Sequence, residues 1–175
     1  MSPLFENYRQ LVARTDALCR VIESALGEQI TCSAGCSGCC TSITIFPVEA
    51  AVLREELSRL PSRRREAILK HVTRQAGNER CPLLFRRRCL LYHARPIICR
   101  THGLPIVYSA GGTLKSDCCP RNLRGTGSTS GAHVVDLDRL NTVLAAVNVL
   151  FSAQSGLDAD AARLTIAEAV IGHRH

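Results

Sequence analysis

Apolar residues at helical spacing dominate the start of the chain and define its first predicted element. Between residues 4 and 25 they recur every three or four positions, so they line one face of a helix. Ser2 and Pro3 suit the cap and first turn of this helix, and Gly27 suits its end. The pattern predicts an amphipathic helix with a buried face formed by Leu4, Tyr8, Leu11, Thr15, Leu18, Ile22 and Ala25.

A short strand and two more helices are expected next. Residues 42–45 alternate polar and apolar side chains, which is typical of a strand. Pro47 then opens a helix that runs to Leu60, because proline followed by an acidic residue is favoured in the first turn. Ser62 suits the cap of a further helix that ends at Gly77.

The pattern changes in residues 81–120, where prolines and cysteines interrupt every helical period. We interpret this segment as rich in loops, with one β-hairpin in which residues 106–108 and 113–115 flank the turn 110–112. Residues 125–131 have the Gly, Ser and Thr composition of a flexible linker.

Two helices are expected after the linker. The first begins at a cap on Asp136 and continues through Leu150 with apolar residues at helical spacing. The second begins at a cap on Asp158 and continues through Leu164 to Ile171. Helices therefore lie on both sides of the loop-rich segment.

The composition agrees with a core of packed helices. A length of 175 residues favours one domain. Hydrophobic residues make up 46% of the chain but aromatic residues only 4%, so Leu, Val, Ile and Ala must build the core. We expect a mainly α fold, a single domain over residues 1–175. Its cysteine-rich, loop-rich metal site at about residues 32–120 includes a short β-hairpin and is flanked by N- and C-terminal helices.

The ten cysteines are far more than ordinary usage. The chain opens with charges interleaved among apolar residues rather than with a basic segment and an apolar run, and no apolar stretch is long enough to span a bilayer. We therefore expect a cytoplasmic protein with no membrane partner. In a reducing compartment, thiol clusters more often mean metal ligands or redox chemistry than structural disulfides.

The formal net charge of +7 admits two interpretations. A basic surface can bind nucleic acid through phosphate, or it can offset the negative charge of ionised thiolates at metal sites. We consider a nucleic-acid partner unlikely because aromatic residues for base stacking are nearly missing. The runs Arg63–Arg65 and Arg86–Arg88 are interpreted as solvated faces.

Four of the cysteines lie in one stretch, CSAGCSGCC, at Cys32, Cys36, Cys39 and Cys40. Short Cys-x3-Cys and Cys-x2-Cys loops bring thiolates within about 2.3 Å of an ion with little loss of chain entropy. Cys39 and Cys40 are adjacent, so both joining one tetrahedral ion would strain the chain. Either one of them is spare, or the two serve two different centres or one enlarged cluster.

Five further cysteines occur in the loop-rich segment: Cys81, Cys89, Cys99, Cys118 and Cys119. The first three and one of the last two, added to the four of the first stretch, give eight ligands, enough for two four-coordinate sites. Cys19 lies on a helix face and is expected to pack in the core. The two cysteine stretches are therefore predicted to converge.

Arg95 and Arg100 flank Cys99 in sequence. A guanidinium in that place could screen thiolate charge or donate hydrogen bonds to sulfur. The alternative is that both are ordinary surface arginines.

The ordered set of motifs resembles the cysteine-cluster family summarised by its CxxCxxCC motif. CSAGCSGCC matches that motif with one extra residue between its first two cysteines, and ITIFPVEAAVL resembles the strand and helix start that follow it. Cys81-Pro82-Leu83-Leu84, Cys89 followed by Tyr92, and Arg95 to Arg100 resemble the later motifs. The resemblance spans residues 32 to about 119 and implies chelation of zinc or of iron.

We expect a metal-binding protein whose cysteines hold an iron–sulfur cluster, with [4Fe–4S] favoured and a second thiolate site left open. Its role would be electron transfer or redox sensing, with an unknown electron-transfer or acidic protein partner. The alternative is a structural zinc module that binds an acidic partner or nucleic acid. A weaker alternative is a thiol enzyme acting through Cys39 and Cys40, although no catalytic constellation is identified.

Overall fold

The computed structural model of the protein describes residues 3–33, 35–124, 131–158 and 162–172. Its longer helices are α1 (Glu6–Leu26), α2 (Pro47–Arg59), α3 (Ser62–Gln75) and α5 (Leu137–Ser155). The shorter helices are α4 (Ile97–Thr101) and α6 (Ile166–Ile171). Single 3₁₀ turns occur at Pro3–Phe5, Gly27–Gln29, Tyr92–Ala94 and Gly131–His133.

The strands form three small sheets. The strand β1 (Thr44–Ile45) pairs antiparallel with β7 (Leu164–Thr165), and β2 (Leu84–Phe85) pairs antiparallel with β3 (Arg88–Cys89). The third sheet has the order β5-β4-β6, in which β4 (Ile106–Ala110) is antiparallel to β5 (Thr113–Asp117) and parallel to β6 (Val135–Asp136).

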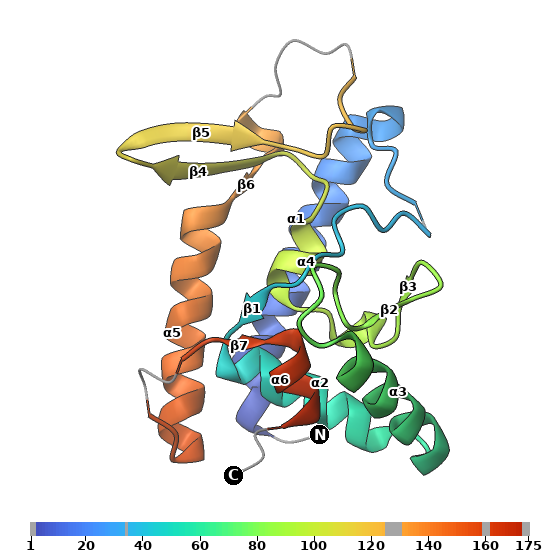
Figure 1. The fold of residues 1–175 in the computed structure, drawn as a ribbon. Coiled ribbons are helices and arrows are strands. Elements are labelled where there is room, and N and C mark those ends of the chain that lie inside the picture. The colour runs from blue at the N-terminus through green and yellow to red at the C-terminus, as the bar shows by residue number, and fades with distance from the viewer. Residues whose placement is uncertain (1–2, 34, 125–130, 159–161, 173–175) are drawn as a thin grey trace.

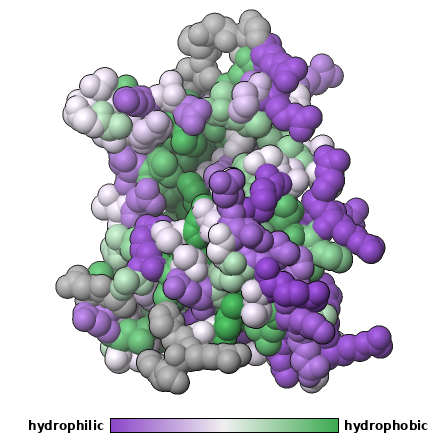
Figure 2. Space-filling model, viewed as in Figure 1, coloured by the Kyte–Doolittle hydropathy of each residue, from purple (hydrophilic) through white to green (hydrophobic). Residues whose placement is uncertain are grey.

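The helix α1 is the central element, and α4 and α5 pack against it. The β4–β5 hairpin crosses one end of α1 and α5, while α2, α3 and α6 gather at the other end (Figure 1). The β2–β3 hairpin projects near the end of α3 (Figure 1), where His71 contacts Leu84 and Phe85. Hydrophilic side chains gather over this side of the molecule (Figure 2). The fold is mainly α, as the sequence predicts.

Three buried apolar clusters make up the core. One joins α2, α3 and α6 through residues such as Leu53, Val72 and Ile166. Another joins α1, α2 and α5, and the third lies under the hairpin and includes Cys19 and Ile22. Cys19 is 6% exposed, which confirms the expectation that it packs in the core.

The first helix matches the prediction, with one correction to its buried face. Leu18 and Ala25 are exposed, and the face continues through Cys19 and Leu26 instead. These two residues keep the spacing of three or four from Thr15 and Ile22, so the thiol takes the place assigned to its neighbour Leu18. Ser2 lies outside the described residues.

Two predicted caps are wrong and one is confirmed. Asp136 caps α5, accepting a hydrogen bond from the backbone N–H of Arg139 at 2.9 Å. Ser62 is instead the first residue of α3, whose cap position is Pro61. The last helix begins at Ile166 rather than after Asp158.

The late start of the last helix has a local cause. Leu164 and Thr165 are taken up by pairing with β1, and Thr165 forms a capping box with Glu168. The β4–β5 hairpin is confirmed. The predicted linker lies outside the described residues except for Gly131. Within the described ranges, none of the helices is long and apolar enough to cross a lipid bilayer.

Candidate metal centre

Backbone pairing brings the two cysteine stretches together. The amide of Cys81 donates to the carbonyl of Cys40 at 3.1 Å, and the amide of Ser42 donates to the carbonyl of Glu79 at 2.7 Å. Thr41 and Arg80 form an antiparallel bridge between these two bonds. The end of the first stretch therefore lies beside the start of the second, which confirms the predicted convergence.

Four half-buried thiols form the first group, which we name the buried tetrad: Cys40, Cys81, Cys89 and Cys99. Burial raises the pKa of Cys99 to about 12, and the neighbouring thiols Cys81, Cys89 and Cys40 raise it further. Burial also raises the pKa of Cys89 to about 11, again with contributions from Cys81 and Cys40. Each member is therefore close enough to others to affect their ionisation.

The remaining thiols of the first stretch form a second group with Cys119, the outer tetrad: Cys32, Cys36, Cys39 and Cys119. Burial raises the pKa of Cys32, and Cys119, Cys36 and Cys39 add to this rise. A methyl group placed on Gly103 would lie 2.6 Å from Sγ of Cys32 and 3.9 Å from Cβ of Cys119. The side chains of Cys32 and Cys119 therefore both lie beside Gly103.

Cys39 and Cys40 differ in the other thiols that affect their ionisation. Two tight turns surround the pair, closed by Cys40 N to Ser37 O at 3.2 Å and Thr41 N to Cys39 O at 2.9 Å. Beside their effect on each other, Cys40 is affected more by Cys81 than by Cys36, whereas Cys39 is affected by Cys36 and Cys119. The thiols of Cys39 and Cys40 still share a hydrogen bond, so the two tetrads are neighbours.

Backbone amides donate to several of the sulfurs. The amide of Gly38 is the main cause that lowers the pKa of Cys36. The amides of Leu83 and Leu84 act on Cys81, and the amide of Leu91 acts on Cys89. In each case a donor lies two residues after the cysteine, and such bonds stabilise thiolates bound to a metal.

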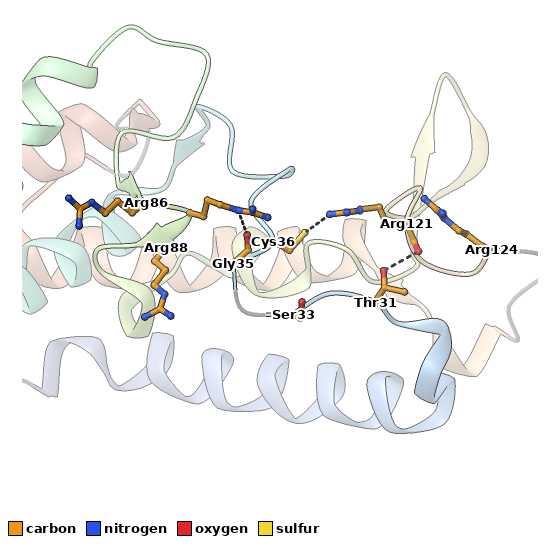
Figure 3. Close-up of a pocket in the computed structure, with 9 residues that line it drawn as sticks. Thr31, Ser33, Gly35, Cys36, Arg86, Arg88, Arg121 and Arg124 are labelled. Carbon is orange, nitrogen blue, oxygen red and sulfur yellow. Dashed lines mark hydrogen bonds between the residues drawn. The ribbon is translucent and has the colours of Figure 1, made fainter.

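Side chains from other elements hold the first cysteine loop in place. Arg80 donates to the carbonyl of Ser37 at 2.7 Å and Arg87 donates to the carbonyl of Gly35 at 2.8 Å. Arg121 donates to Sγ of Cys36 at 3.6 Å (Figure 3). From the sequence, only Arg87 was considered, as part of the run Arg86–Arg88 interpreted as a solvated face. Arg80 and Arg121 were missed, although Arg121 lies two residues after Cys119.

Asn122 is a second residue that sequence reasoning missed. It is 3% exposed and donates to Sγ of Cys32 at 3.4 Å and to the carbonyl of Gly103. Its amide oxygen accepts the backbone N–H of Thr31 at 2.8 Å. A buried amide with these partners fixes the entrance of the cysteine loop against the segment after Cys119.

Glu49 positions the helix that carries Cys99. Its carboxylate, 2% exposed, accepts the amide of Phe46 at 3.0 Å at the start of α2. It also accepts the amide of Ile97 at 2.9 Å at the start of α4. From the sequence we expected only that an acidic residue suits this first helical turn, and neither contact was predicted.

Arg95 and Arg100 differ in what they contact. Arg100 donates twice to the carboxylate of Asp16, at 2.8 and 3.0 Å, and to the carbonyls of Arg95 and His93. These bonds tie α4 to α1 and go to oxygen rather than to sulfur. Arg95 stacks over the ring of Tyr92 at 3.8 Å, and its charge lowers the pKa of Cys89 against the larger effect of burial.

Cys118 stands apart from both groups. Burial raises its pKa, with contributions from Asp117 and Cys119. All ten cysteines are free of disulfides. In the part of the chain that the structure describes, no three Cys, His, Asp or Glu side chains are arranged to hold a metal ion as they stand. Ligation by either tetrad therefore requires the thiol side chains to rotate inward.

Comparison with protein families agrees with this chemistry. A model of the CxxCxxCC family, described as a "putative zinc- or iron-chelating domain", matches residues 31–122. The chain belongs to the CxxCxxCC family. The matched segment contains both tetrads, as well as Arg121 and Asn122, which bond to Cys36 and Cys32. The protein therefore carries a cysteine-rich metal-binding domain, with zinc and iron as the metals that the family description names. No curated protein and no solved structure matches the chain.

Proposed function

We propose that the buried tetrad holds a [4Fe–4S] cluster and that the outer tetrad is a second thiolate metal site. The protein would then act in electron transfer or redox sensing. The observation that carries this proposal is geometric: the backbone of Cys40 is bonded to that of Cys81, whereas Cys32 and Cys119 both lie beside Gly103. Ligation by four thiolates suits both iron–sulfur clusters and zinc.

The surroundings of the buried tetrad support iron. Amide donors to Cys81 and Cys89 are the kind of contact that sets the reduction potential of a cluster. Cys39 and Cys40 are adjacent and belong to neighbouring tetrads. Such an arrangement favours a polynuclear centre over two isolated metal ions. Arg95 adds positive charge beside Cys89.

Loading of the buried tetrad must release protons. The pKa values of Cys89 and Cys99, about 11 and about 12, leave both thiols protonated at neutral pH. Only thiolates are metal ligands, so the ion has to displace these protons. The amides that donate to Cys81 and Cys89 stabilise the charge that results.

A structural zinc module is the second candidate. Cysteine loops of two or three intervening residues are also typical of four-cysteine zinc sites. The outer tetrad, with its Cys32-x3-Cys36-x2-Cys39 loop, has this form. Such a module would bind an acidic partner through its arginine-rich face.

Metal analysis of protein purified without air distinguishes the two candidates. We expect iron and acid-labile sulfide in equal amounts, with a visible absorption that is bleached reversibly by reduction. Stoichiometric zinc without sulfide would remove the iron proposal. A cluster that cannot be reduced and reoxidised would remove the redox role.

Two single substitutions test the division of the thiols. We expect Cys40→Ser to lose iron and sulfide together, whereas Cys39→Ser keeps them and loses metal from the outer tetrad alone. If both variants lose the same metal in the same proportion, the two tetrads act as one centre.

A further inference from the structure

A pocket of about 670 Å³ opens beside the first cysteine loop (Figure 3). The turn between β2 and β3 forms one side and the segment after Cys119 forms the other, with Thr31, Ser33, Gly35 and Cys36 between them (Figure 3). The described residues that line it include five arginines and no acidic side chain. We name this feature the arginine pocket, after Arg86, Arg87, Arg88, Arg121 and Arg124.

The charges of these arginines are not balanced by carboxylates. Among the described residues, the ion pairs of arginine involve Arg9, Arg59 and Arg100, and none involves an arginine of the pocket. Arg87 and Arg124 each use Nε to donate to a backbone carbonyl, at 2.8 and 3.4 Å. This bond holds each guanidinium in position. Within the described ranges, its two terminal nitrogens donate no hydrogen bond to another residue.

The turn that carries Arg86 and Arg87 is conformationally costly. The two residues connect β2 to β3 directly and have φ values of 48° and 64°. A two-residue turn with positive φ at both positions strongly prefers Asn and Gly. Arginines kept in such positions indicate a role for their side chains rather than for the backbone.

Neutralisation of the thiolates does not account for the whole set. Arg121 donates to Sγ of Cys36, and the charges of Arg121 and Arg87 both lower the pKa of Cys36. Arg124 instead donates to a carbonyl oxygen, and Arg86 packs over the ring of Phe85 at 5.3 Å. The pocket therefore offers positive charge beyond what the cysteine loop uses.

We propose that the arginine pocket binds a small soluble ligand that carries two or more phosphate groups. A guanidinium group can donate two parallel hydrogen bonds to the oxygens of one phosphate. Each phosphate carries up to two negative charges, so a few phosphates neutralise the positive charge of the pocket. Its volume lies in the range of about 300–1,000 Å³ typical of small-molecule sites. Its lining contains no aromatic residue on which a base could stack, so the phosphates are the recognised part.

Binding of tripolyphosphate to the full chain tests this proposal by calorimetry at low salt. The pocket variant is Arg86→Gln/Arg88→Gln/Arg124→Gln. It keeps Arg87 and Arg121, which donate hydrogen bonds to the cysteine loop. The matched control is Arg63→Gln/Arg64→Gln/Arg74→Gln on α3, which removes the same charge from exposed arginines. We expect the pocket variant to weaken binding about tenfold or more, because charge-assisted bonds are lost, and the control to change it less than about twofold.

Several results would overturn the proposal. One is that the wild-type protein does not bind tripolyphosphate at about millimolar concentration. Another is that both variants weaken tripolyphosphate binding equally, which would indicate nonspecific charge attraction. A DNA duplex or an acidic peptide that binds and is not displaced by tripolyphosphate would assign the pocket to a macromolecule. Loss of metal from the pocket variant alone would assign the arginines to the thiolates. Metal content is measured separately, so failure here leaves the metal proposal standing.

Discussion

The carboxylate of Glu49 on α2 accepts the backbone N–H of Ile97, the first residue of α4, at 2.9 Å. The other oxygen of the same carboxylate accepts the amide of Phe46. One buried side chain thus satisfies the free amides at the starts of two helices. Since α4 carries Cys99, the position of that thiol depends on a residue 50 positions away in the sequence.

Substitution Glu49→Gln is expected to destabilise the fold. The new NH₂ group faces one of the two backbone N–H groups, so a buried donor loses its acceptor, at a cost of about 1–3 kcal/mol. Urea unfolding of the metal-free protein measures this free energy. Glu56→Gln on the same helix is the control, because the Glu56 ion pair with Arg59 is long, at 4.0 Å, and on the surface. Equal effects of the two substitutions would contradict the role of Glu49.

Gly103 is expected to tolerate no side chain, for two separable reasons. Its φ is 95°, and a methyl group there would lie 2.6 Å from Sγ of Cys32. Gly112 has φ of 74° but nothing within 4 Å of such a methyl group. Gly112→Ala should therefore show only the cost of the backbone conformation, about 1–2 kcal/mol.

Gly103→Ala should lower the free energy of unfolding more than Gly112→Ala does. It should also reduce metal binding by the outer tetrad, because Cys32 must move. Thermal unfolding and metal analysis of the two variants provide the measurement. An outer tetrad that binds metal normally in Gly103→Ala would show that Cys32 is not a ligand.

Cys118 and Cys119 are expected to behave differently although they are neighbours. Cys119 influences the ionisation of Cys32 and Cys39, whereas the charges that raise the pKa of Cys118 are those of Asp117 and Cys119. Cys119→Ser should lose about one metal equivalent from the outer tetrad, and Cys118→Ser should keep the wild-type content. The reverse result would exchange the roles assigned to the two thiols.

The stability of the metal-free protein should fall above pH 9. Burial raises the pKa of Cys99 from 9.0 to about 12 and that of Cys89 to about 11, so the folded state keeps protons that the unfolded state releases. The contribution is complete below pH 9 and is lost as the pH rises toward these values. Melting temperatures of the reduced apoprotein between pH 7 and 11 test this. Cys99→Ala should show a shallower decline, and an identical decline would contradict the assignment.

Local patterns in the sequence were sufficient for the helices, the hairpin and the family. Apolar spacing predicted α1 to within two residues at each end, and Asp136 was identified as the cap of α5, which continues beyond Leu150 to Ser155. The last helix was misjudged because pairing between Leu164 and Ile45, which are distant in sequence, overrides local propensity. The wrong assignment of Ser62 shows that a good cap residue does not fix a helix start when a proline precedes it.

The candidate site was predictable in its residue types but not in its grouping. Spacing identified the nine clustered cysteines, yet the separation of Cys39 from Cys40 depends on the pairing of residues 40–42 with 79–81. Glu49 and Asn122 act through contacts to backbone groups remote in sequence, for which spacing carries no signal. The arginine pocket likewise needs Arg121 and Arg124 opposite the β2–β3 turn.

Both tetrads draw thiols from the two sides of the α2–α3 segment, and this has a consequence for unfolding. An ion held by Cys40 and Cys99, or by Cys36 and Cys119, would cross-link chain segments that are free to separate in the denatured ensemble. Such a cross-link restricts the denatured chain in the way a disulfide does, and more so for longer loops. Chelation should therefore make unfolding harder even where it leaves the helices unchanged.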